Sequence, residues 1–165
     1  MTPQEIIELK LSPALDECER HQYHLHRAWE EAKTFFPLKQ GGEGELTDEQ
    51  VRVLDQLLFR FGRLQDAIGT RLLPATLQLV QEWQERAPFL DKLNRAEKIG
   101  ILPSVEEWQL LRELRNQTAH EYPGQPELVR ENLARLLDHV PDLEAIHAQV
   151  AAWGRERAHA YSGKK

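Results

Sequence analysis

Four side chains with complementary chemistry lie within one stretch of eight residues in the last third of the chain. Arg115 is followed directly by Asn116, and His120 and Tyr122 come five and seven positions after the arginine. A guanidinium keeps its positive charge and offers several donors to phosphoryl oxygens, whereas an imidazole gains or loses a proton near neutral pH. Together with an amide and a phenol, these groups could act on a phosphodiester without a metal ion.

The reaction that suits these groups is cleavage of RNA. The ribose 2′-OH attacks the adjacent phosphorus, so a base must take its proton and an acid must protonate the leaving 5′ oxygen, and His120 could do either. Arg115 could stabilise the charge that develops on the phosphoryl oxygens, and Asn116 could orient the phosphate or the imidazole. We therefore expect these three residues to be catalytic. Arg112 and Lys98, in the same positively charged part of the sequence, are candidates for substrate binding.

The spacing of Arg115 and His120 requires the helix that carries them to be interrupted. Five residues of a regular helix would place the two side chains about 140° apart around the axis. Asn116 is a weak helix former, and Pro123 disfavours the helical conformation at Tyr122. We therefore expect the helix to bend or end here, so that both side chains reach one groove. A second copy of the chain in a dimer could supply the rest of the site.

The same residues also have a purely structural explanation. Arg115 near the end of a helix would be favoured by the helix dipole. His120 would then cap backbone carbonyls, and Tyr122 would pack against the neighbouring helices. This explanation accounts for each residue singly but not for their combination.

Length and composition describe one soluble globular domain. The chain has 165 residues, 41% of them hydrophobic and 29% charged, so we expect a single helical domain over residues 1–165. The net charge of −6 argues against a surface that binds nucleic acid everywhere but allows a local basic groove. The single cysteine, Cys18, cannot form an internal disulfide, and we find neither a signal peptide nor a membrane-spanning segment. We therefore expect a cytoplasmic protein without a membrane partner.

Apolar residues recur at helical spacing along almost the whole chain. The predicted helices begin at Ser12, Thr47 and Ser104, each a preferred N-cap residue, and Gly100 is expected to end a short helix in a left-handed conformation. Pro141 is expected to restart the last helix. Because no segment alternates like a strand, we predict an all-α fold, an antiparallel helical bundle with a four-helix core plus short extra helices.

Two polar features of the predicted helices need an explanation. His21, His24 and His26 lack the i, i+4 spacing of a helical metal site, so we expect surface or partly buried imidazoles, and we expect neither a metal nor a cofactor. Gln65 interrupts an apolar stripe and must find a hydrogen-bond partner. It and its neighbour Asp66 could fix the packing of the helix or approach the active groove.

Residues 115–122, Arg-Asn-Gln-Thr-Ala-His-Glu-Tyr, resemble the R-x4-H-x-Y signature of HEPN-domain proteins, most closely the HepT-like toxins of bacterial toxin–antitoxin pairs. Residues 60–66 also look like part of the second helix of that group. The resemblance implies a homodimer with facing motifs that acts as a metal-independent ribonuclease and arrests growth. By position, Arg115 and His120 would be catalytic and Asn116 accessory.

The resemblance also implies a protein partner. The cognate antitoxin would be a minimal nucleotidyltransferase that attaches AMP to the motif tyrosine, which by position is Tyr122. Some HEPN proteins are instead non-catalytic binding subunits of nucleotidyltransferases. In that alternative, Arg115 and His120 would form a nucleotide- or protein-binding surface.

Overall fold

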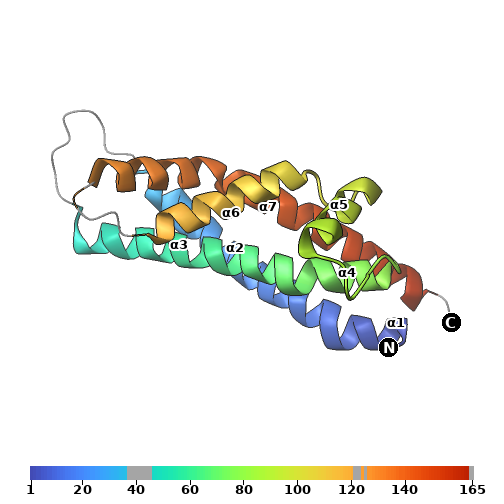
Figure 1. Ribbon diagram of the computed structural model, residues 1–165. Coiled ribbons are helices and arrows are strands. Elements are labelled where there is room, and N and C mark those ends of the chain that lie inside the picture. Colours follow the sequence, from blue (N-terminus) through green and yellow to red (C-terminus); the bar gives the residue numbers. More distant parts are fainter. Residues whose placement is uncertain (37–45, 121–123, 125, 164–165) are drawn as a thin grey trace.

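The computed structural model describes residues 1–36, 46–120, 124 and 126–163. All regular elements in these residues are helical, which confirms the prediction of an all-α fold (Figure 1). In chain order they are α1 (Pro3–Ile6), η1 (Ile7–Leu11), α2 (Ser12–Ala32), α3 (Asp48–Ala67), η2 (Ile68–Leu72), α4 (Leu73–Leu79), α5 (Phe89–Ile99), α6 (Val105–Ala119) and α7 (Pro126–Ser162).

The elements assemble into four long helical segments that run alternately up and down the bundle (Figure 1). The first consists of α1, η1 and α2, and the second of α3, η2 and α4; each is continuous. Helices α6 and α7 form the other two, and the short helix α5 lies beside one end of α6. No helix in the described part of the chain is both long enough and apolar enough to cross a membrane.

The first helix begins earlier than the sequence predicted. Ser12 lies inside a continuous helical segment that starts at Pro3, so its prediction as an N-cap is wrong. The actual cap is Thr2, whose hydroxyl accepts a hydrogen bond from the Glu5 backbone N–H at 3.2 Å. The predicted caps at Thr47 and Ser104 and the left-handed Gly100 are confirmed.

A widened turn precedes a proline in each of the first two helical segments. In η1 the Ser12 backbone N–H donates to the Ile7 carbonyl, and Pro13 follows; in η2 the Leu73 N–H donates to Ile68, and Pro74 follows. A proline cannot donate to the carbonyl four residues before it, and its ring clashes with that carbonyl in a regular helix. The π-type turn relieves this conflict, so both helices pass through a proline without ending. Elements η1 and η2 are in contact.

The core runs the length of the bundle between the four segments. It is built mainly from leucine, isoleucine, valine and alanine, and its buried aromatic side chains include Phe36, Phe61 and Trp108. Val51 and Val129 share the helical spacing of apolar residues with their buried neighbours, but both are exposed. Helix α7 passes through Pro141 without interruption, so this proline does not restart a helix. The packing holds α6, the helix that carries Arg112, Arg115 and Asn116, against α3.

Candidate functional site

Helix α6 ends where the sequence predicted a break. Its last residue is Ala119, and His120 follows with an extended backbone (φ −89°, ψ 138°). The Thr118 hydroxyl donates to the carbonyls of Leu114 and Arg115 at 3.1 and 2.9 Å, local bonding of the kind that weakens the last turn of a helix. His120 is therefore exposed at the first non-helical position. Tyr122 lies outside the described residues.

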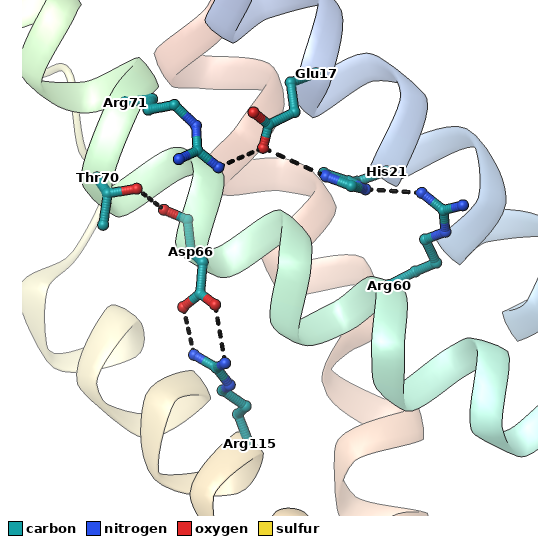
Figure 2. A network of polar contacts seen from close by, with 7 residues as sticks. All are labelled: Glu17, His21, Arg60, Asp66, Thr70, Arg71 and Arg115. Atoms are coloured by element: carbon teal, nitrogen blue, oxygen red, sulfur yellow. Dashed lines mark hydrogen bonds and ion pairs between the residues drawn. The ribbon is translucent and has the colours of Figure 1, made fainter.

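Arg115 is held by a carboxylate from another helix. Its Nη1 donates to Asp66 Oδ1, and its Nη2 donates to Asp66 Oδ2 at 2.9 Å (Figure 2). Two parallel N–H···O bonds fix both the position and the plane of a guanidinium. The arginine and aspartate side chains are still 37% and 43% exposed, and the guanidinium keeps N–H groups that this pair does not use. The arrangement therefore presents an oriented cation to solvent.

Gly62 makes room for this arginine. A Cβ atom at position 62 would lie 3.2 Å from Arg115 Nε, so the guanidinium stem rests directly on the α3 backbone. Gly69, seven residues later, is covered in the same way by Trp108, whose Cζ2 would be 3.0 Å from an added Cβ. The two glycines thus accommodate side chains of α6.

A cavity of about 250 Å³ opens beside the Asp66–Arg115 pair. It lies between α3, η2, α5 and α6, and its walls contain Gln65, Asp66, Gly69, Thr70, Phe89, Trp108, Arg112 and Arg115. The structure therefore brings Arg112 and Arg115 together. Lys98 is exposed on α5 and lines a separate cavity with Lys92 and Arg95.

The other two candidates for catalysis lie on α6 or directly after it and are not among the residues that line this cavity. Asn116 is exposed one residue after Arg115. His120 is exposed at the C-terminal end of the same helix. The side chain of Arg115 is fixed by an ion pair to Asp66 of another helix.

A second polar network joins α2 to α3 next to Asp66 (Figure 2). Arg71 donates to Glu17 at 2.5 Å, and Arg60 Nη1 lies 2.8 Å from His21 Nδ1. Because arginine can only donate, His21 Nδ1 must accept, which leaves the ring proton on Nε2, 3.4 Å from Glu17. His21 is buried rather than at the surface, so this contact explains one histidine that the sequence left without a role.

The network holds its groups in defined charge states. Burial lowers the pKa of His21, and the charge of Arg60 lowers it further, so the imidazole is neutral. Burial alone would raise the pKa of Glu17, but the hydrogen bond and charge of Arg71 bring it below its ordinary value. These contacts attach α3 to α2 on either side of Asp66, and so they support the residue that holds Arg115.

Sequence reasoning missed the partner of Arg115 and the network behind it. Asp66 was expected, with Gln65, either to fix the helix or to approach the active groove, but its pairing with Arg115, 49 residues later, was not predicted. Within the described residues, no group of three or more His, Cys, Asp or Glu side chains could hold a metal ion. No family model, no curated protein and no solved structure matches this chain.

Proposed function

We propose that this chain is an endoribonuclease of the HEPN type, the toxin of a bacterial toxin–antitoxin pair, which cleaves RNA without a metal ion. The observation that carries the proposal is the bidentate pair between Asp66 and Arg115, which orients a guanidinium at the surface near the end of α6. His120 follows directly after the last residue of that helix, where the backbone becomes extended.

The proposed reaction is an internal transesterification. The 2′ oxygen forms a bond to phosphorus while the bond from phosphorus to the 5′ oxygen breaks, which gives a 2′,3′-cyclic phosphate and a free 5′-OH. His120 takes the 2′ proton or gives a proton to the 5′ oxygen, and in a homodimer the histidines of the two copies divide these tasks. Arg115 donates to the phosphoryl oxygens as their charge grows, with Asn116 orienting the phosphate.

The test is RNA cleavage by purified protein in the presence of EDTA. We expect His120→Ala to abolish cleavage and growth arrest while the helical circular dichroism spectrum stays unchanged. His159→Ala, which removes an exposed histidine near the end of α7, is the matched control and should cleave normally. Cleavage by His120→Ala at the rate of the unchanged protein would refute the proposal.

The antitoxin part of the proposal concerns Tyr122. We propose that a minimal nucleotidyltransferase neutralises the toxin by attaching AMP to this phenol. Intact-protein mass spectrometry after co-expression should show the added mass of one or more AMP groups, and Tyr122→Phe should remove it. An unmodified tyrosine in fully neutralised toxin would contradict this step.

A second candidate function is that of a non-catalytic partner of a nucleotidyltransferase. The observation in its favour is that Asp66 already balances the charge of Arg115, as it would in a purely structural ion pair. Expression of the chain alone in a bacterium separates the two functions, because a ribonuclease toxin arrests growth and a binding subunit does not.

A further inference from the structure

The cavity beside Arg115 contains buried polar groups that other described residues do not satisfy. Gln65 is only 3% exposed, and neither its Oε1 nor its Nε2 has a hydrogen-bond partner among the described residues. Trp108 is 2% exposed, and its indole Nε1–H also has no hydrogen-bond partner among the described residues. Buried amides are normally hydrogen-bonded because desolvation without compensation is unfavourable. Two such groups in the wall of one cavity point to a ligand that would satisfy them.

The dimensions and walls of the cavity suit a flat heteroaromatic ring. An apolar cavity of about 150 Å³ holds benzene, so the 250 Å³ found here leaves room for a bicyclic ring. Phe89, which is 37% exposed, supplies aromatic surface to the wall, and the buried Trp108 ring lies behind it, on the other side of Gly69, which adds no side chain between the two. Bases stack on such side chains with little dependence on their identity.

Positive charge at the same cavity fits the phosphate attached to such a base. Arg112 and Arg115 both line it, and among the described residues Asp66 is the only acidic side chain in the wall. Because Asp66 is engaged by Arg115, Arg112 remains as an exposed cation at this site. The wall therefore combines the aromatic ring of Phe89, the amide residue Gln65 and the cation Arg112, which is placed to bind a phosphate.

We propose that this cavity binds an adenine base of the RNA, next to the phosphate that Arg115 contacts, and that Gln65 determines the preference for adenine. The inference rests on the proposed ribonuclease function. A glutamine amide offers one donor and one acceptor, which match adenine N7 and N6, whereas guanine presents two acceptors, N7 and O6, on the same edge. Because both amide atoms of Gln65 are buried, the side chain must rotate toward the cavity as the base enters.

The experiment uses adenosine 5′-monophosphate, guanosine 5′-monophosphate and inorganic phosphate as probes of the full chain. Binding is followed by the NMR signal of the Trp108 indole N–H, identified by its loss in Trp108→Phe. We expect the adenine nucleotide to bind about 5- to 150-fold more tightly than the guanine nucleotide, the range expected for one bidentate pair. Phosphate alone should leave the indole signal in place.

Gln65→Leu is the decisive variant. It should remove the difference between the two nucleotides and raise the urea midpoint of unfolding, because it deletes an unsatisfied buried amide. Gln109→Leu makes the same change on the exposed face of α6 and should alter neither nucleotide binding nor the preference. Phe89→Ala, a change at a partly exposed residue that should leave the fold intact, is expected to weaken both nucleotides equally.

The outcomes separate this inference from the ribonuclease proposal. Equal binding of both nucleotides, or an adenine preference that survives in Gln65→Leu, overturns the base site even if the chain cleaves RNA through His120. If Gln65→Leu does not fold, undiminished binding of both nucleotides by Phe89→Ala overturns it. Adenine-selective binding by a chain that leaves RNA intact would support the cavity as a nucleotide site and refute cleavage.

Discussion

The contact between Gly62 and Arg115 allows the position of the guanidinium to be changed without removing any group from the site. In Gly62→Ala, the new Cβ would lie 3.2 Å from Arg115 Nε, which is closer than a Cβ atom normally approaches another side chain. The arginine must therefore move by a few tenths of an ångström or swing out of its pair with Asp66. Both groups of the proposed phosphate site would remain present but would be misplaced.

Gly62→Ala is expected to change the free energy of unfolding little but to reduce the rate of RNA cleavage. Alanine in place of glycine inside a helix stabilises it by roughly 1 kcal/mol. Weakening a pair whose partners are 37% and 43% exposed costs at most about 1 kcal/mol. The free energy of unfolding should therefore change by less than about 1 kcal/mol. Because a shift of about 1 Å in a positioned group can reduce a rate about 100-fold, the smaller shift expected here should reduce cleavage roughly 10-fold.

The assay is single-turnover RNA cleavage, with urea unfolding of the same preparations. Asp66→Ala removes the carboxylate instead of crowding the arginine and should slow cleavage by a similar factor. Asp55→Ala, at an exposed position of α3, is the matched control and should behave like the unchanged chain. If Gly62→Ala and Asp66→Ala both cleave at the original rate, the orientation of Arg115 by α3 has no part in the chemistry.

Three further predictions concern the core. Burial lowers the pKa of His21 and His147, so these imidazoles take up protons at a higher pH in the unfolded chain than in the folded one. The free energy of unfolding should therefore fall as the pH drops below about 6.5, by at most about 1.4 kcal/mol per pH unit for each histidine. His147→Gln should reduce this pH dependence in urea titrations. Gly154→Ala would place a Cβ 2.9 Å from Leu11 Cδ1 and should lower the free energy of unfolding by about 1–3 kcal/mol in the same titrations. An unchanged free energy of unfolding would show that α7 and η1 can move apart at no cost. Burial raises the pKa of the Cys18 thiol to about 12, so a thiol reagent at pH 8 should label it only in denaturant, and rapid labelling of the folded chain would contradict its burial.

Most of the fold could be predicted from local signals. Helical spacing of apolar residues located the long helices, and the caps at Thr47, Ser104 and Gly100 fixed several ends because capping chemistry is local. The start of the first helix was misplaced because Ser12 and Pro13 have the form of a helix beginning. A π-type turn lets the helix continue through that proline, and the pattern of apolar residues does not report such a turn.

The candidate site could be predicted only in its local part. The residues of α6 and the end of that helix follow from types and spacing within a few positions. The pairing of Arg115 with Asp66 depends on how α3 and α6 pack, and no property of either segment alone specifies it. Gln65 gave a signal, since a polar residue in an apolar stripe required a partner, yet the partner it needs is absent from the described residues.

The widened turn η2 sets the angular phase of everything before it on the same helix. If Pro74 were replaced by alanine and Ile68–Leu72 wound as a regular helix with all five residues kept, the upstream part of α3 would rotate by about 100° relative to α4, and Asp66 would point away from α6. Deleting one of these five residues together with that replacement would restore both the regular winding and the original direction of the Asp66 carboxylate. The direction in which the carboxylate faces thus depends on a match between one surplus residue and the widened turn that accommodates it.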